Sequence, residues 1–508
     1  MSKKTAAQKE QGREKGMENA LQLGKSIPGT ILRLSGPAIL EQFFICLASL
    51  VDTAMVGSIG AAATASVAIN ISSVWLINGC ITALSVGFSF LVSHSVGEKD
   101  PVKTESAVRQ SIAASVTLGA LLTATVLAIH RVLPRILGAE PDVLPGAQAY
   151  MGIIGLGLTG QTLGVVLSAV LRSAGDTETP MAANLASNLL NVVGNFFLIY
   201  PTRQVVLPFR GGSSLASAGS SALLPATDPV LAVGSPVLAA GAPQITLWGA
   251  GLGIRGAAIA TSLSQYALAA MLLYAICHVP TPAKIRLRGD YRFRRQTLRS
   301  LFHIGIPVLL ERVTLCLGQI GLTAMISGLG TVPLAAHYLT SQTESLLYLP
   351  AYGFAYTGTT LIGQSLGARD RKLAARFARD ICIISTVVIL AACVPVYVFA
   401  GEIIRLFSSD VGVARLGIAT IRIAAATEIF FSFFIVACGI CRGAGDVKFP
   451  LAVSLIGMWG LRIGLVWLVT RVFRWGVAGV WIAIAVDCFV RSCLFLWRLA
   501  NGKWMEAA

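Results

Sequence analysis

An acidic residue interrupts the first long apolar stretch of this chain. Asp52 follows Pro37 by 15 residues, or about 22 Å of helix at 1.5 Å per residue, which predicts a position in the outer half of a first membrane span. An ionisable side chain within a bilayer is costly unless it faces a cavity or a partner. We therefore interpret Asp52 as a cation- or proton-binding residue, with a carboxylate that reaches back to the outer surface as the alternative.

Four asparagines form a polar face on a later apolar stretch. Asn184, Asn188, Asn191 and Asn195 are spaced by four, three and four residues, so they lie on one side of a helix. Within lipid that side must turn inward, where amides either hold helices together or line a wet cavity. A buried carboxylate with amide neighbours suits Na⁺ or a proton, and these residues do not choose between the two ions.

Three glutamates also fall within apolar stretches. Glu428 lies near the middle of one of them and is a candidate for the lining of a substrate cavity. Glu41 and Glu311 each follow a proline, Pro37 and Pro307, by four residues. This spacing favours hydrogen bonds near a helix break at the proline, with Glu311 kept as a second candidate for the cavity.

The composition requires a membrane. Apolar residues make up 55% and charged residues 13% of the 508 positions, and the mean hydropathy is +0.73, which excludes a soluble enzyme of any common class and a disordered chain. The net charge of +16 would suggest nucleic acid as the partner of a soluble protein. Here the basic residues gather on alternate loops between apolar stretches, so we expect a lipid bilayer and no nucleic acid.

The apolar stretches number twelve. A bilayer core of about 30 Å needs roughly 20 apolar residues per helix. The stretches are 31–58, 66–93, 108–133, 148–171, 181–201, 252–277, 301–326, 334–362, 381–400, 417–441, 450–470 and 476–498. Lys and Arg are about three times as frequent on the side of the membrane that holds the N-terminus as on the other side. This bias predicts that both termini are cytoplasmic. We expect a multi-pass protein of the cell (plasma or inner) membrane.

The chain repeats itself at an offset of 270 residues. LRSAGDTETP at 171–180 matches ICRGAGDVKFP at 440–450. The offset superposes Pro37 on Pro307, Glu41 on Glu311, Ser95 on Ser365, Gly97 on Gly367, Asp100 on Asp370, Arg172 on Arg442, Gly175 on Gly445, Asp176 on Asp446 and Pro180 on Pro450. Six helices followed by six in the same orientation predict two lobes related by an axis along the membrane normal, with a solute cavity between them.

The acid and its amide face do not recur in the second half. At the same offset Asp52 falls on Leu322, and the four asparagines fall on Ser454, Met458, Leu461 and Leu465. An architectural feature should tend to survive in both halves. We therefore favour a cation or proton site confined to the first lobe.

The predicted fold class is an all-α polytopic membrane protein with twelve transmembrane helices in two six-helix lobes. Its expected parts are a cytoplasmic tail (1–29), an N-terminal lobe (30–278), a cytoplasmic interlobe linker (279–300), a C-terminal lobe (301–498) and a second cytoplasmic tail (499–508).

The first lobe also carries an insertion. Near the end of each half, GIRG at 253–256 matches GVAG at 476–479, and the offset there is 223 instead of 270. The first half therefore holds 47 extra residues. We place them at 202–248, a segment rich in Ser, Gly, Ala and Pro. This composition favours a flexible external loop over a structured cap.

No motif indicates enzyme chemistry. The sequence has no HExxH motif and no P-loop. Two GxGxxG strings, at 155–160 and 251–256, are expected at or within spanning helices without a preceding strand, where small residues allow close packing. We expect no enzyme, no cofactor apart from Na⁺ or H⁺ as coupling ion, no metal beyond a possible Na⁺ at the Asp52 site, and no obligate protein partner.

Several motifs together resemble the multidrug and toxic compound extrusion (MATE) family, in its prokaryotic form. They are VDTAMVG at 51–57, LRSAGDTETP at 171–180, NVVGNFFLIYP at 191–201, GAAIAT at 256–261 and ICRGAGD at 440–446. The resemblance covers about residues 30 to 498. It implies two lobes that alternate between outward and inward states, and multidrug efflux of organic, often cationic, xenobiotics against Na⁺ or H⁺.

The resemblance also implies site residues by position. An ion-binding role falls on Asp52, Asn191, Asn195 and Thr261. Of these, Thr261 comes from the resemblance alone, whereas Asn188 is included as a member of the polar face.

A second-lobe ion site has less support. One branch of the family uses carboxylates in the seventh and tenth helices, where this chain has Leu315 and Phe431. Glu311 and Glu428 lie one turn earlier than those positions.

The expected function is a secondary active antiporter that exports small organic compounds by alternating access. The alternative is a flippase or exporter of a lipid-linked or other endogenous metabolite. Such a flippase would show more than twelve spans or a strongly cationic cleft, and the sequence indicates neither.

Overall fold

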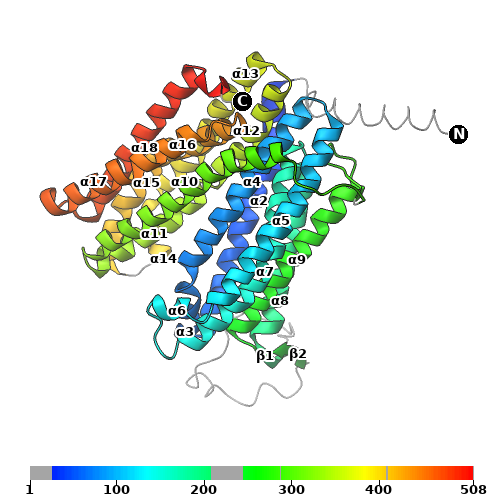
Figure 1. The fold of residues 1–508 in the computed structure, drawn as a ribbon. Helices are drawn as coiled ribbons and strands as arrows, with labels where there is room; N and C mark the ends of the chain where they lie inside the picture. The colour runs from blue at the N-terminus through cyan, green and yellow to red at the C-terminus, as the bar shows by residue number, and fades with distance from the viewer. Residues whose placement is uncertain (1–25, 207–243, 287, 408–409, 507–508) are drawn as a thin grey trace, which may run out of the picture.

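The computed structural model describes residues 26–206, 244–286, 288–407 and 410–506. Long helices run side by side in two bundles (Figure 1). Residues 1–25 of the expected tail and 207–243 of the expected external loop lie outside the described residues.

The first bundle is built from the N-terminal half. It contains α2 (Ile27–Gly57), α3 (Ala61–Ala68), α4 (Ile71–Gly97), α5 (Pro101–Ile129), α6 (Leu133–Ile136), α7 (Leu144–Ser173), α8 (Glu178–Ile199) and α9 (Ile254–His278). Local signals explain the helix starts. Asp100 caps α5, where its carboxylate accepts hydrogen bonds from the backbone N–H of Val102 and Lys103 and Pro101 opens the helix.

The second bundle follows the same plan. It contains α10 (Arg295–Ser327), α11 (Thr331–Leu347), α12 (Leu349–Gly367), α13 (Arg371–Val398), α14 (Ala400–Phe407), α15 (Val411–Gly443), α16 (Lys448–Leu455), η2 (Ile456–Arg462), α17 (Ile463–Trp467), η3 (Leu468–Phe473), α18 (Gly476–Ala500) and η4 (Lys503–Glu506). Asp370, the repeat partner of Asp100, caps α13 in the same way.

The helices agree with a polytopic membrane protein. Among the described residues, 11 helical segments are long and apolar enough to cross a bilayer. The expected span 334–362 is divided instead into α11 and α12, which meet at Tyr348. Pro350 lies in the first turn of α12 and has no N–H to continue the hydrogen bonding of α11, which explains the break.

The expected helix break at Pro37 is wrong in this structure. The helix α2 continues through Pro37, and α10 continues through Pro307. A proline removes one backbone hydrogen bond, but a membrane helix tolerates this loss where neighbouring helices pack around it. The helix α2 has such neighbours in α8 and α12.

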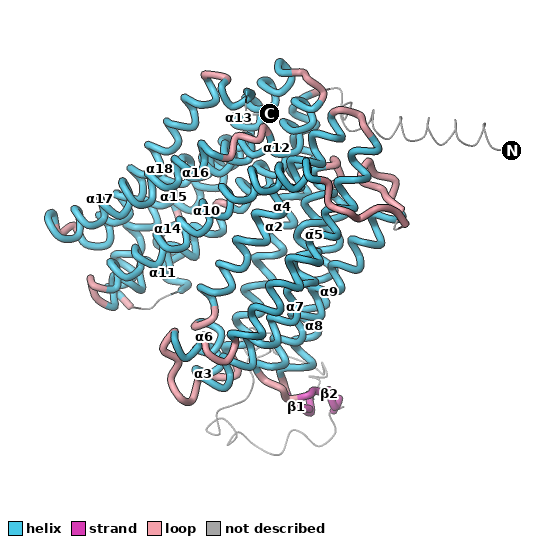
Figure 2. Tube along the Cα trace, in the orientation of Figure 1, coloured by secondary structure: helices cyan, strands magenta, loops and turns pink. Residues whose placement is uncertain are grey.

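The ends of the expected external loop are ordered into strands. β1 (Pro201–Val206) pairs antiparallel with β2 (Gln244–Ala250), and the two-stranded ribbon projects beyond α8 and α9 (Figure 2). The prediction of a flexible loop over 202–248 is therefore wrong at both ends of that segment, where the chain forms strands.

The two GxGxxG strings do different things. In α7, a Cβ at Gly157 would overlap Ser262 and one at Gly160 would press on Tyr266, so the first string permits close packing on α9, as expected. The second string does follow a strand, contrary to expectation. Gly251 and Gly253 have φ of +64° and +54° and turn the chain from β2 into α9, without the parallel βαβ unit of a dinucleotide site.

Two hydrogen bonds between the lobes are related to each other by the 270-residue repeat. The Nε2 atom of His94 lies 3.0 Å from the carbonyl oxygen of Gly443, and Nε2 of Gln364 donates to the carbonyl of Ser173 at 2.9 Å. His94 and Gln364 are 270 residues apart, as are Ser173 and Gly443. One contact is therefore the repeat image of the other.

Two glycines permit the helices α4 and α12 to approach at this joint. A Cβ at Gly97 would overlap the carbonyl of Gln364, and a Cβ at Gly367 would overlap the carbonyl of His94. Gly97 and Gly367 are themselves repeat partners. The joint therefore depends on the absence of a side chain at both positions.

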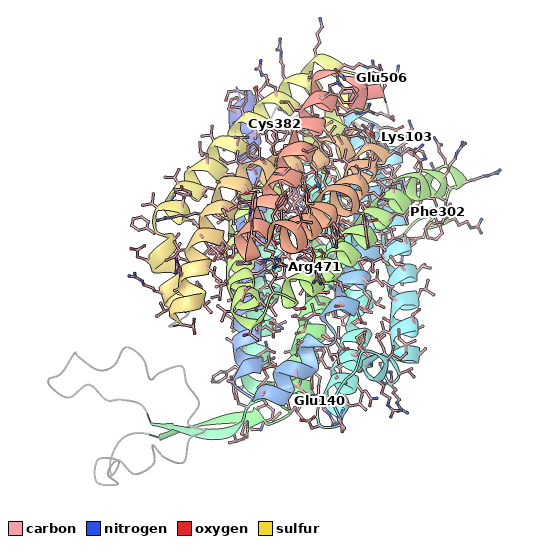
Figure 3. The ribbon with its side chains drawn as sticks, turned by 90° about the vertical axis from the view of Figure 1, so that its left-hand side faces the viewer. Lys103, Glu140, Phe302, Cys382, Arg471 and Glu506 are labelled. Carbon is pink, nitrogen blue, oxygen red and sulfur yellow. The ribbon has the colours of Figure 1, made fainter. Side chains whose placement is uncertain are left out.

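The bundles meet at one end of the molecule and diverge at the other. They are together where α2 begins and α18 ends, and they separate toward the β ribbon (Figure 1). Lys103 and Glu506 lie toward the joined end and Glu140 lies at the opposite end (Figure 3).

We expect Gly367→Val to keep the lobes from joining at this end, because the new side chain has no room beside the His94 backbone. A cysteine replacing the fully buried Ser365 in a protein without its native cysteines should then react with a maleimide several-fold faster. Gly464→Val is the matched control, since a Cβ at Gly464 meets nothing within 4 Å. Equal labelling in both variants would count against this joint.

Candidate functional site

Two helices of the first lobe, α2 and α8, run parallel and touch through polar side chains at two levels. Asn184 donates to Glu41 at 2.8 Å, and Asn195 donates to Asp52 at 2.6 Å. The two pairs have the same sequence separation of 143 residues. The levels are 11 residues apart, or about 16 Å of helix.

The level of Glu41 is a buried ion pair. Nη1 of Arg172, from the end of α7, donates to both carboxylate oxygens of Glu41, at 2.7 and 2.9 Å. Glu41 is only 2% exposed. The hydrogen-bond partner is therefore an arginine of another helix, and α2 has no break near Glu41.

The second lobe repeats this ion pair. Nη2 of Arg442 donates to both oxygens of Glu311, at 3.0 and 2.9 Å, and Ser454 lies at 3.5 Å in the place of Asn184. Because both lobes carry it, the carboxylate–guanidinium pair belongs to their architecture.

At the level of Asp52, side chains of the first lobe form a chain of hydrogen bonds. Beyond its bond to Asp52, Nδ2 of Asn195 lies 3.4 Å from Oδ1 of Asn191. Asn191 in turn donates to the hydroxyl of Thr261 in α9 at 3.2 Å. The structure thus brings together four of the five expected ion-site residues. Asn188 stays apart, because its buried Nδ2 has no hydrogen-bond partner in the described part of the chain.

An unsatisfied oxygen completes this level. Asn195 is fully buried, and its Oδ1 atom has no hydrogen-bond partner among the described residues. A buried acceptor without a donor is costly, and a cation beside it would satisfy it as a hard oxygen ligand. A proton on Asp52 would do so as well, if the amide turned over to accept it. The geometry therefore fits Na⁺ and H⁺ alike.

The corresponding part of the second lobe holds a different group. The fully buried Asp487 accepts hydrogen bonds from Nε of Arg491 and from Nε of Arg462, each at 2.7 Å. The i, i+4 spacing of Asp487 and Arg491 indicates their pair. Arg462 could not be found in this way, because it lies 25 residues away, where the π-helical η2 ends.

A cavity of about 1280 Å³ lies between the lobes, mostly against the second. Its walls come from α4 and α7 on one side and from α10, α11, α12, α15, η2 and α18 on the other. Its arginines are Arg172, Arg312, Arg442, Arg462 and Arg491, and its acidic residues are Glu311 and Glu344. Five different segments each bring an arginine to this cavity, which the sequence did not indicate, and carboxylates pair with four of these arginines.

The two glutamates proposed for the cavity differ in position. Glu311 lines it, but its carboxylate is held by Arg442. Glu428 is fully buried outside the lining, where Oε1 accepts a hydrogen bond from Ser432 at 2.6 Å and Oε2 has no partner in the described chain. This geometry does not support contact between Glu428 and a substrate.

Comparisons with known proteins fit both the repeat and the fold. The family model MatE matches residues 37–197 and again 307–468. The chain is 23% identical to "Probable multidrug resistance protein NorM" of Thermotoga maritima over 94% of this chain and 93% of that protein. It is 22% identical to "Multidrug and toxin extrusion protein 1" of Pongo abelii, over 94% and 75% respectively.

Solved structures share the fold. A MATE protein in complex with MaD3S superposes with a TM-score of 0.81 at 22% identity, over 96% of this chain and 99% of that one. A MOP superfamily transporter from Pyrococcus furiosus superposes with a TM-score of 0.79 at the same identity and coverage.

We expect Glu41→Gln to destabilise the protein, because Arg172 would remain as a buried charge without its partner, a loss of about 3–5 kcal/mol. Glu428→Gln is the matched control, since no arginine or lysine of the described residues pairs with that carboxylate. Thermal denaturation of the purified variants measures the difference. Equal Tm values for the two would contradict the role given to the ion pair.

Proposed function

The chain belongs to the MATE family of multi-pass membrane transporters, and from this premise we propose that it is an antiporter. It exports small organic compounds while Na⁺ or H⁺ moves inward through the Asp52 site. Relatives named for multidrug resistance and for multidrug and toxin extrusion support the export of foreign compounds.

The polar network of Asp52 carries this proposal. A carboxylate, two amides and a hydroxyl meet at one level of the first lobe, and one buried oxygen there lacks a donor. The second lobe has leucine in place of Asp52, Asn191 and Asn195. A network that the architecture does not need, and that costs free energy to bury, is typical of an ion site.

The arrangement of the bundles supports an outward-facing state. The lobes diverge away from the start of α2 and the end of α18 (Figure 1). If the termini are cytoplasmic, as the distribution of Lys and Arg predicts, the divergent end faces outward. Asp52 lies five residues before the end of α2 at Gly57, so an ion from outside has a path of only about 7 Å along the helix to reach it.

One helix links the ion site to the cavity. α2 carries both Asp52 and Glu41, and Glu41 holds Arg172, which lines the cavity. The hydroxyl of Thr360 in the second lobe donates to the carbonyl of Arg172 at 3.1 Å. A shift of α2 on ion binding would therefore reach both the substrate and the lobe contact. Linkage then requires that the ion weakens substrate binding by the same factor as the substrate weakens ion binding.

The alternative is export or flipping of a lipid-linked or other endogenous metabolite. The five arginines of the cavity favour it, because phosphate groups of such molecules pair well with guanidinium. Transport of a fluorescent phospholipid between leaflets, with no transport of soluble dyes, would select this alternative.

We expect Asp52→Asn to reduce ion-driven efflux at least about tenfold, because a neutral amide cannot bind and release the charge that drives the cycle. The assay uses proteoliposomes loaded with soluble fluorescent dyes of either charge, with Na⁺ and pH gradients imposed separately. Asp142→Asn, an exposed acid outside the spans, is the control. Efflux by Asp52→Asn at the wild-type rate under both gradients would refute the assignment.

A further inference from the structure

Four of the five arginines in the cavity form an ion pair with a carboxylate. Arg172 is neutralised by Glu41 and Arg442 by Glu311, with shortest N–O distances of 2.7 and 2.9 Å. The two pairs are related by the 270-residue repeat, and each joins two helices within its own lobe. Arg462 contacts Asp487 at 2.7 Å.

Arg491 shares Asp487 with Arg462, which leaves one excess positive charge in that group. Glu344 also lines the cavity, but in the described residues it forms no ion pair with either arginine. One donor of this group is without an acceptor. Arg491 is 2% exposed, and its Nη2 atom has no hydrogen-bond partner in the described part of the chain.

Arg312 is the cavity arginine that lacks a counter-charge. It lies on α10, 15 residues before the helix ends at Ser327, and so about 22 Å from that end. Within residues 26–206, 244–286, 288–407 and 410–506 it makes no ion pair, and its buried Nε has no partner. Arg312 and Arg491 line the same cavity, from α10 and α18 of the second lobe.

The architecture of a lobe does not require these two charges. At the offset of 270 Arg312 corresponds to Gln42, and at the offset of 223 Arg491 corresponds to Leu268. The first lobe therefore folds with a neutral residue at each place. Since an unpaired guanidinium within the membrane is costly, its retention beside a cavity indicates a ligand.

The chemistry of the cavity defines that ligand. Guanidinium pairs with carboxylate and phosphate through short, charge-assisted hydrogen bonds. The same cavity is lined by aromatic side chains, including Trp75, Tyr348, Phe434 and Trp481, which suit an apolar or aromatic body. Its volume of about 1280 Å³ exceeds the roughly 300–1,000 Å³ of usual ligand pockets.

We propose that the substrate is an amphipathic organic anion whose carboxylate or phosphate group binds between Arg312 and Arg491 in the second lobe. This assignment rests on the proposed function for export, but binding itself needs no ion gradient. It replaces the cationic substrates implied by the family resemblance. The anion and the coupling ion then occupy different lobes, which allows one to leave as the other enters.

Equilibrium binding to the purified full-length protein tests the assignment. The probes are tritiated 1-naphthylacetate, 1-naphthyl phosphate and 1-naphthylmethylammonium, which share one ring system and differ in charge. We expect at least one of the two anions to bind at least about tenfold more tightly than the ammonium probe. Tighter binding of the ammonium probe would overturn the proposal.

Variants locate the binding group. Arg312→Gln should weaken anion binding about tenfold or more, Arg312→Lys should restore most of it, and Arg312→Glu should reverse the preference toward the ammonium probe. Because Arg312 has no ion pair to lose, these changes spare the lobe architecture. The control is Arg422→Gln, which removes an exposed arginine of α15 that contacts the ring of Tyr397 and does not line the cavity. Unchanged anion affinity in Arg312→Gln would refute the role of Arg312.

Two further measurements separate the possible failures. Asp52→Asn should still bind an anion more tightly than the ammonium probe, so loss of transport with a retained preference for anions concerns the coupling site alone. Competition by dihexanoyl phosphatidic acid at lower concentrations than 1-naphthyl phosphate would identify a lipid headgroup as the source of the phosphate. The reverse order would identify a soluble anion. Failure of every anion to bind, in a protein that still exports a cationic dye, would reject this inference and leave the proposed function in place.

Discussion

The buried carboxylate–guanidinium pair in each lobe is the interaction on which the rest of the structure depends. A single charge inside a bilayer is prohibitive, but a carboxylate held by both of its oxygens to an arginine is neutral as a pair. Glu41 with Arg172 and Glu311 with Arg442 tie the first helix of each lobe to the end of another helix. The carbonyl of Arg172 also accepts from Thr360 across the lobe boundary. The same residues therefore hold each lobe together and define where the lobes meet.

Function arises where the two lobes stop being alike. Above the shared ion pair the first lobe places Asp52 among amides, whereas the second lobe places leucines there and surrounds Asp487 with two arginines. In transporters built from two repeats, alternating access is largely a rigid-body rocking of one repeat against the other. Different charges on the two lobes then allow two ligands of opposite sign to be bound apart from each other. In the proposed antiporter, coupling between them passes through α2, which carries both Asp52 and Glu41.

Glycine determines how closely the lobes approach. The joint formed by His94, Gln364 and their repeat-related carbonyl partners exists because neither Gly97 nor Gly367 carries a Cβ. Backbone carbonyls accept these bonds, so the joint buries few charged groups. A contact made of two neutral hydrogen bonds can open and close at modest cost, as the proposed alternating access requires.

The sequence alone determined the membrane class, the repeat and most of the polar network around Asp52, because hydropathy, the 270-residue offset and helical spacing are local or periodic signals. It identified Asp52, Asn191 and Asn195, while Thr261 needed the family resemblance. Only the tertiary structure decided which charges are paired, since Arg172 and Arg462 meet their carboxylates across different helices whereas Arg312 meets none among the described residues. Helix packing also decided that Glu428 lies outside the cavity lining and that five arginines line the cavity. The continuity of α2 through Pro37 was likewise decided by the neighbouring helices that pack around it.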